Sequence, residues 1–367
     1  MKLFGVIINM SQLDKTNINN DGLTNFGSLF KHVIEGKSAL ELETVNNLFK
    51  RDPELFNSKL PKTILISGLP RTGTTFLYNM LSKNERALFF NRIELLNPSF
   101  YTLDDVEKLK ILKKMDFFHK VLNKTNPKLK YIHLPELEDP DEDDWLLSFK
   151  NASIPHNLIF GNFSKLYSIL EGVDSQENYS FYEAAIRTLL YSKYKENIGD
   201  SFLLLKAPGH GPFLEKMDQI FKPIFVFTYR NPVNQLESLL KLFYEYNRII
   251  SVNFVDKKYR AYCGRQILEF SKCFYEKTEK QKALLNNESI IHASNYDLRN
   301  NHKKVVNTIL DKADVCFSEK YEELLSFDLG NKNPDTNQVD FFDFFCLDKD
   351  YINKCFYEYF KSYHEFF

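Results

Sequence analysis

The sequence predicts an α/β fold: a three-layer α/β/α arrangement with a central, mostly parallel sheet and helical additions at both ends. Three apolar runs have the length and composition of buried strands, at residues 64–66, 202–205 and 224–228. Each run leads toward a segment with helical periodicity, and repeated strand–helix units of this kind form right-handed, mostly parallel sheets. Polar side chains follow the carboxyl end of each run, which is the edge of the sheet where ligands bind in such folds.

The chain divides into three parts in this interpretation. Residues 1–60 are expected to form a helical lead-in, whose amphipathic pattern stops near Asp52 and Pro53. Residues 61–330 are expected to form the α/β domain, and residues 331–367 a loop and a helix that pack on the same domain. Further elements are expected as helices at 104–122, 181–194, from 233 onward, 302–313, 317–326 and 348–364, and as a strand at 289–293.

The first strand leads into a short glycine-bearing loop and then into a helix. The strand ends at Gly68, the loop passes through Arg71, and Gly73 precedes a helical pattern that contains Phe76 and Leu77. The backbone N–H groups of such a loop and of the first helical turn point at one place, and the helix dipole favours negative charge there. The loop therefore predicts an anion site, whereas a plain strand–turn–helix without ligand is the simpler alternative.

The nature of the anion follows from a comparison with the ATP-binding loop G-x-x-x-x-G-K-[ST]. Gly68, Gly73 and Thr75 fit this P-loop pattern, but Thr74 occupies the position of the lysine, and the cation is Arg71 inside the loop. A loop that handles β- and γ-phosphates with magnesium keeps that lysine. The sequence thus predicts a P-loop-like fold with a different phosphate ligand, and a kinase that uses ATP and magnesium remains the alternative.

Two further clusters follow the second and third strands. Lys206 and His210 follow the strand at 202–205, and Arg230 follows the strand at 224–228 with Ser238 two helical turns later. An arginine fork and a hydroxyl in this arrangement can hold one dianionic phosphate. Together with the loop they describe a ligand that has two separated anionic groups.

Residues 131–145 are rich in acidic side chains. An EF-hand that starts at Asp139 is excluded, because no glycine stands at its sixth position and its twelfth is Lys150. No metal site is therefore expected. The simplest interpretation is a solvated acidic turn before a helix, and the alternative is a loop beside the substrate that supplies a general base. The candidates for that base are His133, Glu138 and Glu142.

Composition limits the classes of partner. The net charge of the 367 residues is −1, so no basic field indicates nucleic-acid binding. The five cysteines form no C-x-x-C pair, which favours free thiols in a reducing compartment. No apolar run has the length of a transmembrane helix, and we expect a cytoplasmic protein that is a monomer or a homodimer.

These motifs resemble those of the sulfotransferases that use 3′-phosphoadenosine 5′-phosphosulfate (PAPS). The loop Pro70–Thr75 is similar to their P-[KR]-[ST]-G-T-T signature, and Tyr229–Pro232 with Ser238 is similar to their 3′-phosphate site. A microbial branch of the family is closer still, because its P-x-E-D-E, L-K-[SA]-P-x-H and Y-x-D-L signatures resemble residues 140–143, 205–210 and 296–298.

The resemblance implies in-line transfer of a sulfuryl group from PAPS to a hydroxyl or amine of a small-molecule or lipid- or polyketide-like acceptor, without a metal. It implies that Arg71, Thr72, Gly73, Thr74 and Thr75 bind the 5′-phosphosulfate and that Arg230 and Ser238 bind the 3′-phosphate. Lys206 and Arg71 would stabilise the transition state. His210 is the best-placed base, and Glu142, Glu138 and His133 are the alternatives. A non-catalytic nucleotide-binding protein would keep the anion site without the base.

Overall fold

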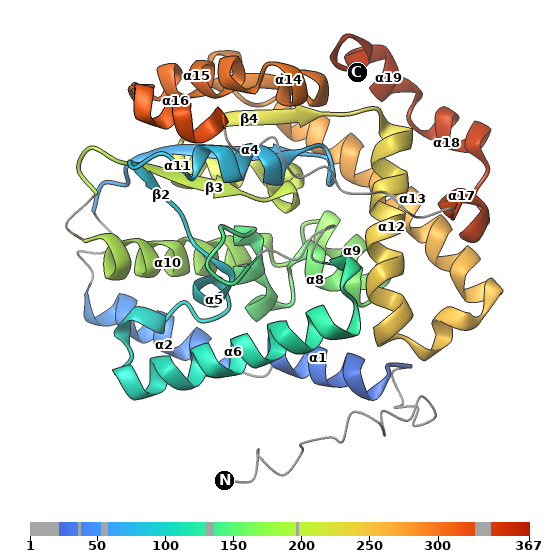
Figure 1. The fold of residues 1–367 in the computed structure, drawn as a ribbon, viewed down its shortest axis with the longest axis horizontal. Coiled ribbons are helices and arrows are strands. Elements are labelled where there is room, and N and C mark those ends of the chain that lie inside the picture. The colour runs from blue at the N-terminus through green and yellow to red at the C-terminus, as the bar shows by residue number, and fades with distance from the viewer. Residues whose placement is uncertain (1–21, 36–37, 53–57, 130–135, 196–197, 327–338) are drawn as a thin grey trace.

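A five-stranded parallel sheet organises the computed structural model, which describes residues 22–35, 38–52, 58–129, 136–195, 198–326 and 339–367. The strands are β1 (Lys62–Gly68), β2 (Ala87–Leu88), β3 (Phe202–Lys206), β4 (Ile224–Tyr229) and β5 (Ile290–Ser294). Their order across the sheet is β2-β3-β1-β4-β5, and every pair is parallel (Figure 1). The predicted α/β class is confirmed, and the four longer strands lie where the sequence predicts them.

The two faces of the sheet belong to two separate cores. Alternate side chains of β1 point to opposite faces, so Ile64 and Ile66 join one core whereas Leu65 joins the other. The first core is closed by α4 (Thr74–Leu81), α14 (Asn295–Asn300), α15 (His302–Lys312) and α16 (Glu319–Ser326). The second is larger and lies against α11 (Leu214–Phe221), α12 (Pro232–Ile250) and α13 (Lys257–Lys282).

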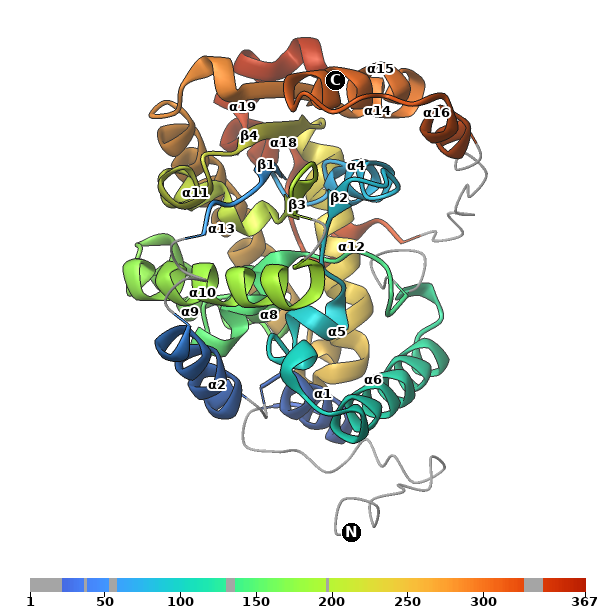
Figure 2. The ribbon, with the colours of Figure 1, turned by 90° about the vertical axis from the view of Figure 1, so that its left-hand side faces the viewer.

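A further layer of helices packs on the second core and contributes side chains to it (Figures 1 and 2). Helix α12 connects this layer to the sheet, because it begins just after β4 and runs down into the layer. The layer contains α1 (Asn25–Glu35), α2 (Ser38–Arg51), α5 (Arg92–Leu95), α6 (Asp105–Thr125), the 3₁₀ helix η3 (Asp143–Lys150), α8 (Ile154–Ile159), α9 (Phe163–Leu170) and α10 (Ser175–Tyr194). The remaining short 3₁₀ helices are η2 (Phe100–Thr102), η4 (Pro208–Phe213), η5 (Val252–Val255), η6 (Asn287–Ser289) and η8 (His364–Phe366).

The C-terminal part forms α17 (Phe341–Phe344), followed by α18 (Lys349–Cys355) and α19 (Tyr357–Tyr363) in place of the one helix predicted at 348–364. Their aromatic side chains join the second core, and so do Phe26 and Phe30 of α1. The division at residues 60 and 330 stays a prediction. Most of the loop predicted after residue 330 lies outside the described residues.

Candidate active site

The loop between β1 and α4 depends on two glycines with backbone angles that other residues rarely adopt. Gly68 has a φ of 136°, and a Cβ there would lie 2.6 Å from the backbone oxygen of Thr228. Gly73, at the N-cap of α4, has a φ of 105°. It supplies no side-chain cap, so the first N–H groups of the helix are left to a ligand.

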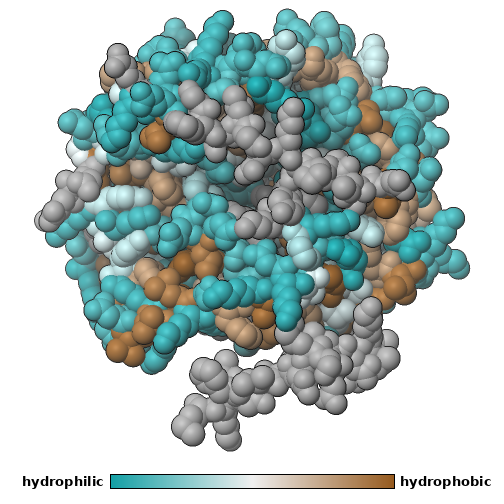
Figure 3. All heavy atoms as spheres, in the orientation of Figure 1, coloured by the Kyte–Doolittle hydropathy of each residue, from teal (hydrophilic) through white to brown (hydrophobic). Residues whose placement is uncertain are grey.

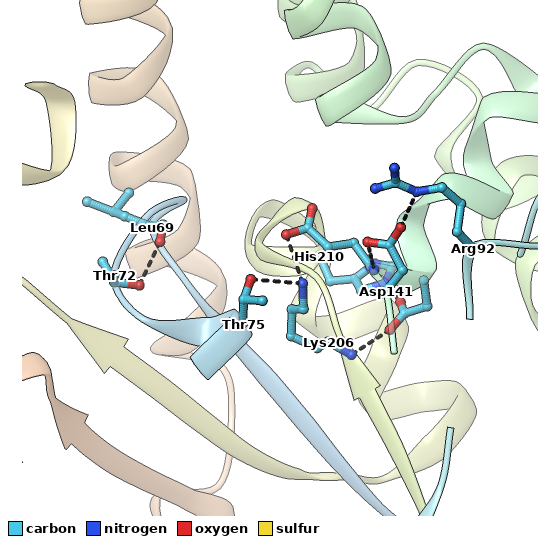
Figure 4. A network of polar contacts seen from close by, with 9 residues as sticks. Leu69, Thr72, Thr75, Arg92, Asp141, Lys206 and His210 are labelled. Carbon is cyan, nitrogen blue, oxygen red and sulfur yellow. Dashed lines mark hydrogen bonds and ion pairs between the residues drawn. The ribbon is translucent and has the colours of Figure 1, made fainter. Parts of the chain in front are cut away.

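Side chains from other elements fix the loop backbone. The amide of Gln235 donates to the Pro70 oxygen at 2.6 Å, and the amide of Asn295 donates to the Thr72 oxygen at 3.3 Å. The hydroxyl of Thr72 is fully buried and donates to the Leu69 oxygen at 2.7 Å (Figure 4). Thr72 therefore supports the loop through its side chain, and only its backbone is left to contact an anion.

Arg71, Ser238 and Arg230 come together across the loop and α12, although the sequence analysis assigns Arg71 to one anionic group and Arg230 with Ser238 to another. The Nε of Arg71 donates to the Ser238 hydroxyl at 3.2 Å, and an Nη of Arg230 donates to the backbone oxygen of Arg71 at 3.2 Å. Burial lowers the pKa of Arg71 to about 10, which the nearby Glu142 carboxylate opposes, so its guanidinium stays charged at neutral pH. Burial also lowers the pKa of Arg230, and the charge of Arg299 on α14 adds to this effect.

Lys206 and Glu142 form a buried ion pair at the end of β3. The Nζ of Lys206 lies 3.0 Å from an oxygen of Glu142 and donates to the Thr75 hydroxyl at 3.4 Å (Figure 4). The Lys206 side chain is only 1% exposed. Because Thr75 belongs to the first turn of α4, this pair lies directly beside the predicted anion site.

His210 lies behind this pair in a closed network. Its Nε2 is 2.6 Å from an oxygen of Asp143, its Nδ1 is 2.8 Å from the hydroxyl of Tyr179, and the ring is fully buried. Asp143 also accepts from Tyr182 and from the backbone N–H of Lys206. Burial alone would raise the pKa of Asp143, but the hydrogen bond and charge of His210 bring it below its usual value.

The acidic stretch is buried, so the interpretation as a solvated turn is wrong. Asp141, Glu142, Asp143 and Asp144 are each at most 7% exposed, because they pack under β3 and η4 and find internal partners there. Asp144 is the exception among them: neither of its oxygens has a hydrogen-bond partner within the described part of the chain. Glu138 lies on an exposed turn, and His133 lies outside the described residues.

Beside Arg92 and Trp145 the protein has a small apolar cavity. Arg92 forms an ion pair with Asp141 at 2.5 Å (Figure 4). The Arg92 guanidinium also lies over the ring of Trp145. The cavity has a volume of about 30 Å³, so it holds a few water molecules at most. It is lined by Phe30, Arg92, Leu96, Met115, Phe118, His119, Leu122, Leu137, Trp145 and Tyr246.

Sequence reasoning missed several of these residues. Arg92 and Tyr246 carry no local motif, and Tyr246 comes near both Arg71 and Arg92 only through the packing of α12. Arg299 could have been found, since it follows the matched residues 296–298 directly. In the part of the chain that the structure describes, no group of three potential metal ligands occurs, and no helix is long and apolar enough to cross a membrane.

Comparison with known proteins agrees with this architecture. The model of the sulfotransferase family matches residues 61–319. Sulfotransferase STF9 from Mycobacterium avium is similar in structure, with a TM-score of 0.75 and 16% identity over 93% of this chain and 86% of that one. Sulfotransferase STF1 from Mycobacterium tuberculosis has a TM-score of 0.69 and 16% identity over 92% and 88% of the two chains. A search of curated proteins gave no match. The family match covers more than half of the chain, which therefore belongs to the sulfotransferase family.

Proposed function

We propose that this sulfotransferase takes PAPS as its sulfuryl donor and transfers the group to a hydroxyl or amine of an apolar small molecule, with Glu142 as the base. One observation carries the proposal: the buried Lys206–Glu142 pair reaches the first turn of α4 through Thr75, and the Glu142 carboxylate acts on the nearby Arg71. The site thus brings a carboxylate that can accept a proton next to the groups that would hold the donor.

The cationic groups fit both anionic ends of the donor. The first-turn N–H groups of α4 and the guanidinium of Arg71 would hold the 5′-phosphosulfate. Arg230 and Ser238 would hold the 3′-phosphate, and Arg299 would add a third contact because its charge already acts on Arg230. Among the described residues no carboxylate forms an ion pair with Arg230, so its charge is available to a phosphate.

The transfer needs one bond to break, one to form and one proton to move. Glu142 accepts the proton of the acceptor hydroxyl or amine as that atom bonds to sulfur. The bond between sulfur and the bridging oxygen breaks, and this oxygen leaves with the 5′-phosphate of 3′-phosphoadenosine 5′-phosphate (PAP). Lys206, released from Glu142 as the carboxylate is protonated, stabilises the negative charge beside Thr75. The residues present supply all of these roles.

His210 is the weaker candidate for the base. A base must reach the proton that it removes, and both ring nitrogens of His210 already have buried partners. We assign His210 the role of orienting Asp143, which in turn binds the backbone N–H of Lys206. Glu142, in contrast, is 7% exposed and pairs with Lys206, which also contacts Thr75 in the first turn of α4.

Calorimetric titration of the purified protein with PAP, and separately with ATP and magnesium, tests the donor. Micromolar PAP binding that is weakened in Arg71→Ala and Arg230→Ala but not in Arg265→Ala supports the proposal, since Arg265 is exposed on α13 away from the loop. Tight binding of ATP without a response to PAP would favour the kinase. PAP release from PAPS with a phenolic test acceptor would then distinguish the enzyme from a non-catalytic binder.

A further inference from the structure

Helix α6 has two contrasting faces. Its inward face carries Ile111, Met115, His119 and Leu122, which are buried, and the last three line the apolar cavity. Its outward positions recur every three or four residues, which places them on one stripe of the helix. We call them the outer row: Val106, Lys110, Lys113, Phe117, Lys120 and Lys124.

The outer row exposes apolar side chains to water. Val106 is 62% and Phe117 67% exposed, and the neighbouring Leu109 and Leu112 are 50% and 39% exposed. These four are among only fifteen large exposed apolar residues in the described chain. Single exposed apolar side chains are normal, but several on one helix indicate a contact surface. Apolar and polar residues alternate over this helix in Figure 3.

The same helix is strongly cationic. It carries six lysines and three acidic residues, although the whole chain has a net charge of −1. Lys120 pairs with Asp116, but in the described residues no carboxylate lies within ion-pair distance of Lys110, Lys113 or Lys124. A positive surface with interspersed apolar side chains is complementary to anionic lipid headgroups above an apolar layer.

We propose that the outer row of α6 docks on an anionic lipid surface. Val106, Leu109 and Phe117 enter the boundary between headgroups and acyl chains, while the lysines contact the lipid phosphates and their stems lie along the apolar layer. The row extends over nineteen residues, from Val106 to Lys124, or about 27 Å of helix, which suits an extended lipid surface.

Flotation of the full-length protein with vesicles tests the docking. We expect binding to phosphatidylcholine vesicles that contain phosphatidylserine, little binding to phosphatidylcholine alone, and loss of binding as salt rises. Each elementary charge should change binding about fivefold, and Lys110→Glu with Lys113→Glu changes the charge by four, so this variant should bind several hundredfold more weakly, about the loss of all detectable flotation. Phe117→Ser should weaken it without a change in salt dependence.

Matched controls lie elsewhere on the surface. Lys312→Glu on α15 and Val255→Ser on η5 change equally exposed residues and should leave vesicle binding intact. The docking is refuted if wild-type protein ignores anionic vesicles, binds neutral ones equally, or if the Lys110→Glu, Lys113→Glu variant still binds. PAP affinity measured on the same variants separates the two ideas: vesicle binding without any response to PAP would overturn the proposed donor but leave the docking in place.

Discussion

Replacing Glu142 by glutamine isolates the proposed base with the smallest change of shape. The carboxylate accepts from Lys206 at 3.0 Å and is 7% exposed, so an amide of the same size fits the site and its oxygen still accepts from Lys206. The amide, however, cannot accept a proton from the acceptor. General-base catalysis contributes about 10²- to 10⁴-fold. Each tenfold corresponds to about 1.36 kcal/mol, so the barrier should rise by about 2.7–5.4 kcal/mol.

The assay is steady-state release of PAP from PAPS with a phenolic test acceptor. We expect kcat to fall by this factor while the affinity for PAP stays close to that of the wild type. Melting temperatures measured in parallel show whether the loss reflects unfolding, because removing one charge of a buried pair also destabilises the protein. Glu138→Gln is the matched control, since Glu138 is exposed and should not change kcat.

His210→Gln decides between the two candidate bases. The variant loses contacts to Asp143 and Tyr179, so its melting temperature should fall, but below that temperature most of kcat should remain. A Glu142→Gln enzyme with kcat within about threefold of the wild type would refute our assignment, because a general base contributes at least about 10²-fold. If His210→Gln then lost activity with its fold intact, the role would return to His210.

Three further substitutions test other parts of the structure. Arg230→Ala should raise the KM for PAPS about ten- to a hundredfold, since a charged hydrogen bond to phosphate contributes about 1.5–3 kcal/mol; an unchanged KM would remove Arg230 from the donor site. Burial raises the pKa of Asp144 well above its usual value, and the charges of Glu142 and Asp143 add to this effect. The folded state therefore binds the proton of the Asp144 carboxyl more tightly than the unfolded state does. Stability should thus fall as the pH rises above the pKa that Asp144 has in the unfolded chain. Asp144→Asn should therefore raise the melting temperature, by more at neutral than at mildly acidic pH, and a lower melting temperature would contradict this. Gly68→Ala should distort the loop and weaken PAP binding because its Cβ would meet a backbone oxygen at 2.6 Å, and calorimetry that shows wild-type affinity would contradict the strain.

The sheet could be predicted because its strands carry local signals. Ile64–Ile66 and the run at 224–228 are apolar on both faces, as strands buried between two cores must be, and they became the centre of the sheet. Strand β2 has only two residues, which is too short for a periodic pattern. Helix α13 was not predicted, because its many charged residues mask the buried side that holds Ile267 and Phe274.

The candidate site could be predicted only where a residue's role is set by its own strand end. Arg71, Lys206 and Arg230 follow strands, and parallel strands bring their ends together whatever the rest of the fold does. No such rule predicts where the side chains of the acidic stretch lie. Its four carboxylates look equally solvated in the sequence, and only packing under η4 gives them different partners. The cavity, too, combines α1, α6 and α12, which are far apart in sequence.

The hydrogen bond from Arg230 to the backbone oxygen of Arg71 joins the two halves of the proposed donor site. A ligand that draws the Arg230 side chain toward it would change the conformation of the loop as well, so under our proposal the two ends of the donor are not recognised independently. Binding energies of half-ligands should then fail to add up to that of the whole donor. A nucleotide without the 3′-phosphate would reach a loop that is less well ordered, and discrimination against it would exceed what its missing contacts alone supply.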